Sequence, residues 1–200
     1  MYCSSRTVSE SKGAKRQRGA GHSLVDAATP AAPSALISPP RWRFAPFDSL
    51  TVRELQYIYM ARQAVFSVEQ QCAFMDADGL DERAYHLAAW SPLQREPLAY
   101  ARLLEPGAKY AEPSIGRVIT TAAARGRGLG RETMVRALAH AAETWPGAAI
   151  RIAAQSRLEA FYASLGFVIA SPRFLEDGID HTEMVRPGAT AGLSAARRGD

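Results

Sequence analysis

The sequence has little cysteine and no long apolar run. Its two cysteines, Cys3 and Cys72, cannot build a disulfide framework or a cysteine-rich metal cluster. We therefore expect no metal site and a reducing compartment, with the cytoplasm as the simplest location. No apolar stretch approaches the roughly 18 residues of a membrane-spanning helix, so we expect no membrane partner either.

A large excess of one charge is also missing. The chain carries 24 Lys and Arg against 20 Asp and Glu, which gives a formal net charge of +4, and much of the charge lies in its two end segments. Since 47% of its 200 residues are hydrophobic, the chain can bury the core of one ordinary domain. Composition hints at an anionic ligand and says no more.

Residues 1–41 are rich in Ser, Ala, Gly and Pro and show no helical or strand period. We expect a disordered basic tail there. An over-extended start has the same composition, as does an organelle transit segment. A nucleic-acid contact is the least favoured reading, because interleaved aromatic residues for base stacking are missing. The folded domain is expected over residues 42–187, with a second flexible tail at 188–200.

The centre of the chain predicts an anion site. An apolar run, Ile115 to Thr121, predicts a buried strand, and a glycine loop follows it, Arg125-Gly126-Arg127-Gly128-Leu129-Gly130. A helix is expected from Leu129 to about Glu143, with one apolar face made by Met134, Val135, Leu138, Ala139 and Ala142. The first amides of a helix point outward unpaired, and glycines let an anion approach them. Arg125, Arg127 and Arg131 add charge that suits phosphate.

Several common motifs do not fit this region. A P-loop needs Lys-Ser or Lys-Thr after its glycines, and a dinucleotide fingerprint needs Gly or Ala where Arg131 stands. The segment Asp76–Asp81 resembles the start of a calcium loop, but Leu87 stands where that loop needs Glu. The glycine loop by itself leaves three readings open: a phosphate-bearing ligand, a flexible basic loop, or an Arg-Gly tract that touches nucleic acid.

A second segment lies downstream of the glycine loop. Residues 148–154 predict a strand, and Gln155 follows it. The sequence Ser156-Arg-Leu-Glu159 predicts a capping box that begins a helix. We expect this helix to end at Gly166 and to carry Leu158, Phe161, Tyr162 and Leu165.

Two of these segments together resemble the GNAT N-acetyltransferase superfamily. The glycine loop is similar to the family's pyrophosphate loop, and Phe161-Tyr-Ala-Ser-Leu-Gly-Phe167 is similar to its Phe-Tyr-x-x-x-Gly-Phe segment. Within the superfamily, the chain resembles the ElaA group from about Phe44 to Arg186, on four segments: 65–72, 76–79, 115–118 and 176–181. The departures are Asp180 in place of Pro and Ser67 in place of an apolar residue.

The resemblance implies an α/β fold with a mixed, mainly antiparallel sheet, flanking helices and a splayed central strand pair. It also implies acetyl-CoA as the acyl donor. The pantetheine arm would pair with the backbone of Val118, Ile119 and Thr120, as an added strand does, and would contact Gln155. The diphosphate would lie on the loop and helix start, formed by Arg125, Gly126, Arg127, Gly128, Leu129, Gly130 and Arg131.

The implied reaction is direct transfer of an acetyl group to a primary amine of a small molecule or peptide. Tyr162 is the candidate acid for the leaving thiolate, and His181 is a candidate base for the amine. Three carboxylates are further candidates for the base: Glu69, Glu176 and Asp177. A non-catalytic module that binds CoA or associates with nucleic acid is the alternative, and a homodimer is left open.

The remaining elements are predicted from pattern. A capping box at Thr51–Glu54 begins a helix that runs from Val52 to about Phe66. Antiparallel strands are expected at 85–90 and 97–104, with two more at 167–170 and 181–185, the last after a polar loop at 172–180 with a tight turn at Asp177-Gly178.

Four side chains outside the motifs have an expected environment. Cys72 is expected as a buried apolar residue and His86 as a structural one. Arg62 is placed at the surface rather than in the substrate cleft. Arg102 is left open between cleft and solvent.

Overall fold

The structure is a computed structural model that describes residues 39–188. The expected tails, 1–41 and 188–200, lie almost wholly outside the described residues. Those between 39 and 188 form one unit that contains the predicted domain. Among its helices, none combines the length and the apolar character needed to cross a membrane.

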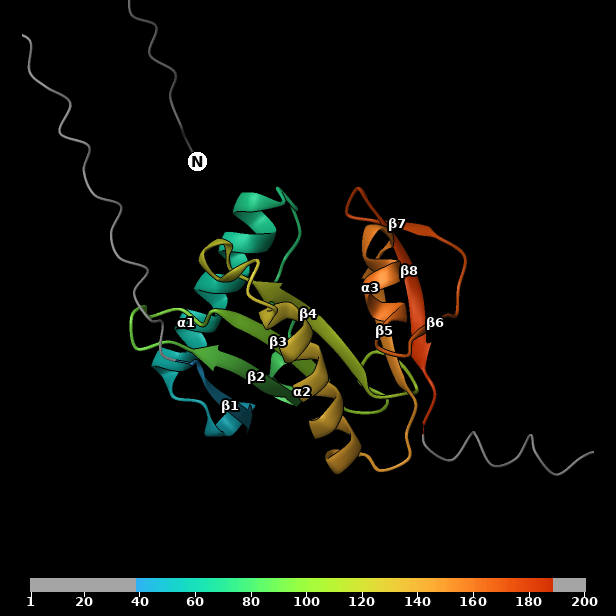
Figure 1. Ribbon diagram of the computed structural model, residues 1–200, viewed down its shortest axis with the longest axis horizontal. Coiled ribbons are helices and arrows are strands. Elements are labelled where there is room, and N and C mark those ends of the chain that lie inside the picture. Colours follow the sequence, from blue (N-terminus) through green and yellow to red (C-terminus); the bar gives the residue numbers. More distant parts are fainter. Residues whose placement is uncertain (1–38, 189–200) are drawn as a thin grey trace, which may run out of the picture. The chain divides into compact units, whose positions relative to one another are not determined.

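One sheet carries the fold (Figure 1). Its strand order is β1-β2-β3-β4-β5-β8-β6, and β7 also pairs with β8. All pairs are antiparallel except β4–β5. This is the predicted mixed, mainly antiparallel sheet. The strands are β1 Arg41–Pro46, β2 Ala84–Trp90, β3 Ala99–Leu104, β4 Ser114–Thr120, β5 Ile150–Gln155, β6 Val168–Ile169, β7 Phe174–Glu176 and β8 Ile179–Arg186.

The one parallel pair is held at one end only. β4 and β5 share a single bridge, Ser114 to Arg151, and the amide of Arg151 donates to the carbonyl of Pro113 at 3.0 Å. Beyond that bridge the two strands diverge, and Figure 1 shows the gap widening toward the carboxyl end of β4. The splayed central pair predicted from the sequence is therefore present.

Helices cover both faces of the sheet. α1 Val52–Gln63 continues into a π-helical segment, η2 Ala64–Glu69, and packs through Ile58, Ala61 and Val65. α2 Leu129–Thr144 and α3 Glu159–Ala163 pack on the opposite face. Short 3₁₀ turns complete the set: η1 Phe47–Ser49, η3 Asp81–Arg83, η4 Ala122–Ala124 and η5 Ser156–Leu158.

The two predicted capping boxes have different outcomes. At Thr51 the side chain accepts from the amide of Glu54 at 3.1 Å, and the Glu54 carboxylate accepts from the amide of Thr51 at 2.9 Å, so this box is confirmed. At Ser156 the prediction was wrong, because the chain forms the turn η5 and neither η5 nor α3 has a side-chain cap. Ser156 instead lies 3.2 Å from the hydroxyl of Thr182 on β8.

The position of α2 was predicted well and its buried face less well. The helix buries Met134, Ala137, Leu138 and Ala141, whereas Val135 is 51% exposed and the predicted face members Ala139 and Ala142 are also exposed. Alanines stand on both the buried and the exposed side of α2, so the sequence pattern does not fix the rotation of the helix about its axis. β1 and β7 are further differences, since the sequence analysis placed no strand in either.

Candidate active site

The glycine loop leaves the start of α2 open. Gly126 and Gly128 have φ of +73° and +76°, a conformation that disfavours side chains, and a Cβ built on either would meet nothing within 4 Å. Gly128 is the N-cap, and its carbonyl accepts from the amide of Glu132 at 3.0 Å. The amides before Glu132 belong to the first turn, where a helix has no partners of its own for them. The predicted glycine loop and helix start are thus present, with the first-turn amides of α2 open.

The three arginines of this region have different environments. Arg125 turns back: its Nε donates to the carbonyl of Thr120 at 3.2 Å and its guanidinium pairs with Glu69 at 2.7 Å. Arg131 donates to the hydroxyl of Ser164 and lies over the ring of Phe161. Arg127 is exposed and has no hydrogen bond or ion pair to any of residues 39–188. Of these three arginines, Arg127 is the one with neither a hydrogen bond nor an ion pair to any residue between 39 and 188.

The edge of β4 that faces the gap carries the predicted pantetheine contacts. β4 has lost its pairing with β5 by Val118, so the β5 side of Val118, Ile119 and Thr120 is not covered by a strand. The side chain of Ile119 is buried under α1, and the carbonyl of Thr120 is already used by Arg125. Backbone groups alternate in direction along a strand, and those of Ile119 face Tyr100 on β3. The backbone available to an added strand therefore centres on Val118 and the amide of Thr120.

A cavity of about 450 Å³ occupies the gap between β4 and β5. Its walls come from η2 and the segment that follows, from β3 and β4, from β5 and α3, and from the β7–β8 hairpin. Four of the predicted site residues line it: Val118, Gln155, Tyr162 and His181. Ile119 and Thr120, the last residues of β4, and the glycine loop that follows them do not line this cavity.

Tyr162 combines a packed ring with a free hydroxyl. The ring contacts Phe161 edge-on, with centroids 5.0 Å apart, and also Phe167. The residue is only 7% exposed, and burial raises the pKa of its hydroxyl to about 12. Within residues 39–188 no group forms a hydrogen bond with that hydroxyl, although the side chain lines the cavity. The two readings of Tyr162, core ring and cavity donor, are compatible.

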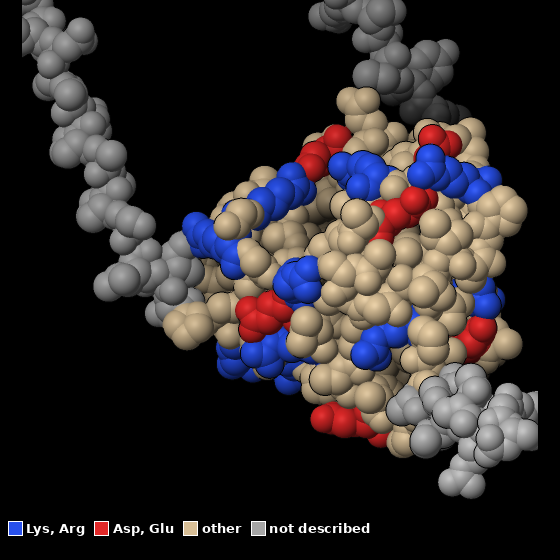
Figure 2. Space-filling view, turned by 45° about the vertical axis from the view of Figure 1, so that its right-hand side comes forward, with Lys and Arg blue, Asp and Glu red and all other residues tan. Residues whose placement is uncertain are grey.

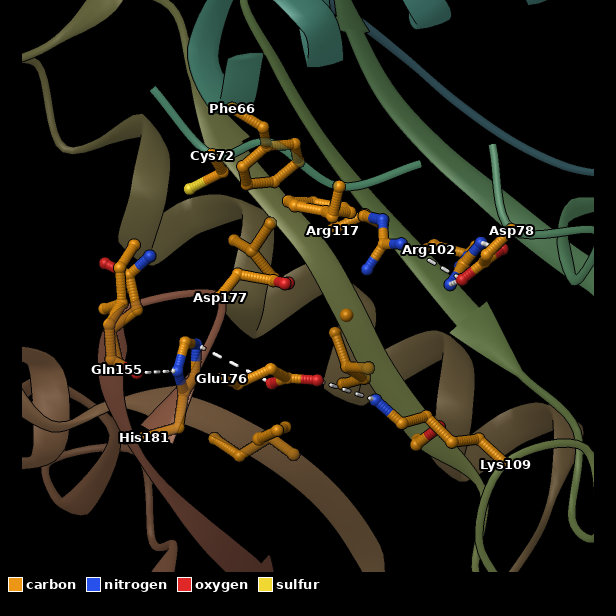
Figure 3. A pocket seen from close by; sticks show the side chains of 18 of the residues that line it. Phe66, Cys72, Asp78, Arg102, Lys109, Arg117, Gln155, Glu176, Asp177 and His181 are labelled. Carbon is orange, nitrogen blue, oxygen red and sulfur yellow. Dashed lines mark hydrogen bonds and ion pairs between the residues drawn. The ribbon is translucent and has the colours of Figure 1, made fainter. Parts of the chain in front are cut away.

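His181 has one ring nitrogen fixed and the other near an acid. Nδ1 lies 2.8 Å from the carbonyl of Ile179, which can only accept, so Nδ1 carries a proton. In the neutral ring Nε2 then has the lone pair. It lies 3.9 Å from Oε2 of Glu176, and Figure 3 shows both side chains in the cavity. His181 therefore has the tautomer of a base and also makes the local turn contact.

Gln155 joins two walls of the cavity. Its Nε2 donates to Oε1 of Gln70 at 3.2 Å, across from β5 to the end of η2, and its Oε1 accepts from Arg157. Both contacts involve mobile side-chain ends, so the amide can exchange them for a ligand. Gln155 also pairs in register with His181, which places the two side chains together (Figure 3).

The other candidate bases separate by environment. Glu69 is paired with Arg125, whose hydrogen bond lowers the pKa of that carboxyl, and it does not line the cavity. Glu176 and Asp177 do line it, on the β7–β8 hairpin. Asp177 and Gly178 both have positive φ, +53° and +79°, so the predicted tight turn is confirmed. The described residues contain no cluster of His, Cys, Asp and Glu that could hold a metal ion.

A buried ionic network forms one wall, and the sequence analysis missed it. Arg62 has no exposed surface, so its predicted place at the surface was wrong. It donates to Asp76 and Asp81 at 2.8 Å each. Arg102 grips Asp78 with two hydrogen bonds of 2.7 Å. An arginine in the last turn of α1 and three aspartates over six residues are a weak signal, because the partners come from separate elements.

This network also fixes the protonation of its members. Burial alone would raise the pKa of Asp78 and of Asp81, but hydrogen bonds from Arg102 and Arg62 outweigh it and lower both. The three carboxylates are thus occupied by three arginines, Arg62, Arg102 and Arg117. None of the three carboxylates is therefore left without an arginine partner.

Two buried residues have the environments expected of them. His86 is 1% exposed and lies between the hydroxyl of Tyr100 and the carbonyl of Asp81, a structural position. Cys72 is 7% exposed, and burial raises the pKa of its thiol. Cys72 does border the cavity, but its raised pKa disfavours the thiolate that a nucleophile needs.

The surface charge is mixed where it can be seen. Figure 2 shows Lys and Arg interspersed with Asp and Glu on the face it presents, rather than gathered in one basic stripe. A nucleic-acid-binding face is typically a continuous basic patch. This view gives no support to the nucleic-acid alternative.

The fold and the gap define a class of proteins, the acyl-CoA-dependent acyltransferases. The family model described as an acetyltransferase (GNAT) domain matches residues 64–186 of this chain. Protein ElaA of Escherichia coli (strain K12) is 35% identical over 147 residues, covering 72% of this chain and 95% of that protein. A UPF0039 protein of Synechocystis is 37% identical over 144 residues, covering 72% and 93%. The chain belongs to the GNAT acetyltransferase family, and its resemblance to the ElaA group is confirmed.

Solved structures agree with this assignment. An acyl-CoA N-acyltransferase from Pseudomonas aeruginosa superposes with a TM-score of 0.71 at 40% identity, covering 74% of this chain and 99% of that one. The structure of Escherichia coli ElaA gives 0.69 at 34% identity, with the same coverage. A CoA-dependent acyl-homoserine lactone synthase, solved with isopentyl-CoA, gives 0.62 at 13% identity and shares the fold alone.

Proposed function

We propose that this protein transfers an acetyl group from acetyl-CoA to a primary amine in one direct step. The observation that carries the proposal is the open β4–β5 gap with the unpaired hydroxyl of Tyr162 at its wall. A glycine loop follows the carboxyl end of β4, and a hairpin that carries candidate bases forms part of the cavity wall, so the two substrates have separate groups to contact.

The residues present fit CoA. The gap offers strand edge at Val118 and Thr120, which suits the amides of a pantetheine arm. The open amides at the start of α2, with Arg127 beside them, suit a diphosphate. Gln155 lies between these two regions of contact. When bound, CoA would supply the thioester that makes the acyl carbon reactive.

Acetyl is the acyl group that the cavity favours. The cavity of about 450 Å³ is small among ligand sites, and it must hold both the acyl group and the acceptor. Large side chains narrow it, among them Phe66, Phe74 and Leu104. A panel of acyl-CoA donors of rising chain length should show the highest kcat/KM with acetyl, and a maximum at a longer chain would overturn this part of the proposal.

His181 and Tyr162 would divide the proton transfers. The attacking amine must be neutral, so His181 Nε2 accepts its proton, directly or through a water. The nitrogen then bonds to the acyl carbon and the carbon–sulfur bond breaks. Because its pKa is about 12, Tyr162 stays protonated at neutral pH and can donate to the departing sulfur. No acyl-enzyme is needed: burial raises the pKa of the Cys72 thiol, which disfavours its thiolate, and Ser156 does not line the cavity.

The test is Tyr162→Phe, assayed by thiol release with acetyl-CoA over a panel of amines. We expect kcat to fall by about 10²–10⁴, the usual range for general acid–base catalysis, while the affinity for acetyl-CoA stays level. Tyr110→Phe is the matched control, because Tyr110 lines the same cavity and has a pKa raised to about 12 by burial. If kcat of Tyr162→Phe stays within threefold of the wild type, the acid role is wrong. Binding of CoA without turnover of any amine would favour the non-catalytic alternative.

A further inference from the structure

Arg117 is placed in the cavity by an irregularity of β4. Opposite β3, Tyr100 pairs with Ile119 and Arg102 with Gly116, so Arg117 and Val118 together oppose one residue. This is a β-bulge, which bends a strand and re-aims a side chain. Arg117 has φ of +52°, a conformation that disfavours a residue with a side chain. Such strain is common where a side chain serves a ligand.

The guanidinium of Arg117 is held on one side only. Its Nη2 donates to Asp78 at 3.0 Å and to the carbonyl of Asp76 at 3.2 Å, and its Nε lies 2.8 Å from Oδ1 of Asp76. The ring of Phe74 lies beneath it. Nη1 has no partner among the described residues, and Figure 3 shows the Arg117 guanidinium turned toward the cavity. One donor of this fork is therefore free to meet a ligand.

The surroundings of Arg117 favour an anion. Arg62 and Arg102 make the better-aligned contacts to the three aspartates, so those carboxylates are already shared. Burial and the charge of Arg102 lower the pKa of Arg117, which means that its charged form is under-compensated there. A ligand carboxylate at Nη1 would relieve this, through a charge-assisted hydrogen bond.

The wall of the cavity opposite Arg117 carries acidic side chains. Glu176, Asp177 and His181 come from the β7–β8 hairpin and face Arg117 across the cavity (Figure 3). Lys109 lies at the rim, 4.0 Å from Glu176. A ligand that carries an ammonium group toward Glu176 and a carboxylate toward Arg117 matches both walls.

We propose that the acceptor is a primary amine with a neighbouring carboxylate, as in a free α-amino acid, and that Arg117 binds this carboxylate. The proposal rests on the acyltransferase function given above and names its second substrate class. It makes Arg117 a specificity-determining residue: the carboxylate is anchored on β4, and the amine is left toward His181. A peptide amino terminus, which has an amide at that position, would not satisfy Arg117.

The first experiment compares acceptors on the wild-type protein. The twenty common L-amino acids, their α-carboxamides and the corresponding decarboxylated amines are assayed with acetyl-CoA by thiol release. We expect kcat/KM for the preferred amino acid to exceed that of its carboxamide by at least about tenfold, as a charge-assisted hydrogen bond allows. The carboxamides have less basic amines, so more of each is neutral at a given pH, which biases the comparison against the expected result.

The second experiment tests whether a mutation of Arg117 removes the preference for the amino acid over its carboxamide. Arg117→Gln should lower the ratio of acid to carboxamide below about threefold. Asp78 keeps Arg102 and Asp76 keeps Arg62 in this variant, so each carboxylate retains a partner. The ratio is measured on one protein sample, which makes it insensitive to a partly unfolded fraction. Lys109→Gln is the control, since it removes a cation from the rim, and the ratio should stay within threefold of the wild type.

A binding measurement separates this inference from the enzymatic function. Calorimetric titration of the CoA-loaded protein with the same amino acids and carboxamides needs no turnover. Tighter binding of the acid, lost in Arg117→Gln, supports the inference even if no acceptor reacts. Equal affinity for acid and carboxamide, or a preference that disappears in Lys109→Gln and survives in Arg117→Gln, would overturn it. Turnover of amines and carboxamides without preference would overturn the inference and leave the acyltransferase function intact.

Discussion

Two groups of three arginines belong to the region of the site, and their environments are opposite. The group between residues 125 and 131 is exposed, sits on a glycine-rich loop, and has at most one ion pair per side chain. The other group, Arg62, Arg102 and Arg117, comes from α1, β3 and β4 and is interlocked with three aspartates. The first group meets solvent or a ligand, whereas the second is part of the framework.

The difference follows from the cost of burying charge. An exposed arginine keeps its hydration, so it adds attraction for an anion without needing a fixed partner. A buried one must be paired, because an uncompensated charge in the interior costs several kcal/mol. The bonds of Arg62 to Asp76 and Asp81 therefore hold the segment between η2 and β2 onto α1, and that segment forms a wall of the cavity.

Of the changes that test this difference between the two groups, Arg62→Met should have the largest effect, a loss of folding stability. Removing a buried partner leaves Asp76 and Asp81 with less compensation, and such changes cost about 3–5 kcal/mol in the free energy of unfolding. Urea denaturation at neutral pH measures it. The matched change in the exposed group, Arg127→Met, should stay within about 0.5 kcal/mol of the wild type.

Equal and small effects of the two substitutions would mean that the network does not anchor the wall. In that case the apolar contacts of Ile58, Ala61 and Val65 alone would hold α1 in place.

The loss of folding stability at low pH should depend on the same network. The pKa of Asp78 and of Asp81 is lowered in the folded protein, below the unfolded value near 3.9. Their contribution is therefore present above about pH 4 and is lost as pH falls through the folded pKa. Urea midpoints between pH 6 and pH 2 should fall accordingly, and 0.5 M salt should change the drop little, because buried pairs are weakly screened.

Surface pairs would behave differently in that experiment. The pair of Glu69 and Arg125 is more than 40% exposed on both sides, so salt weakens it. If the fall of the urea midpoint at low pH disappears in 0.5 M salt, the pH dependence comes from such surface pairs and not from Asp78 and Asp81.

The sequence predicted the exposed group well because its signal is local. A strand, a glycine loop and a helix start follow one another over residues 115–131, and each depends on neighbours along the chain. The tight turn at Asp177-Gly178 was predictable for the same reason. Tyr162 was named from the family resemblance and His181 from its imidazole chemistry, and no local pattern in the sequence says that both line the same cavity.

The buried group was not predictable because its signal is tertiary. Arg62 lies 14 residues from Asp76 and 19 from Asp81, and nothing along the sequence says that they meet. The bulge at Arg117 could not be predicted either, because no sequence pattern marks an arginine with positive φ. Ser156 failed as a cap because β8 offered Thr182 as a competing partner.

Gly128→Glu should have an intermediate effect, on ligand affinity. Its side chain would enter the space next to the open amides of α2 and bring a negative charge to an anion site. We expect acetyl-CoA to bind at least about tenfold more weakly, which corresponds to 1.4 kcal/mol, as measured by calorimetry. Gly107→Glu is the control, because Gly107 also has positive φ, +79°, open space around it, and a place at the other end of β4. Equal losses in both variants would point to general strain and remove the glycine loop from the site.

The smallest expected effect belongs to Arg127, the one arginine of the glycine loop with no partner among the described residues. Its charge is exposed, so its attraction for a diphosphate acts through water and should be modest, about 0.5–1 kcal/mol at low salt. Arg127→Gln should weaken acetyl-CoA by roughly two- to fivefold at 0.01 M salt, where the screening length is about 30 Å. At 1 M salt, where that length is about 3 Å, the variant and the wild type should converge. The free energy of unfolding should not change, in contrast to Arg62→Met. A loss of affinity that persists at 1 M salt would mean that Arg127 makes a direct, desolvated contact with the ligand, and the exposed group would then resemble the buried one.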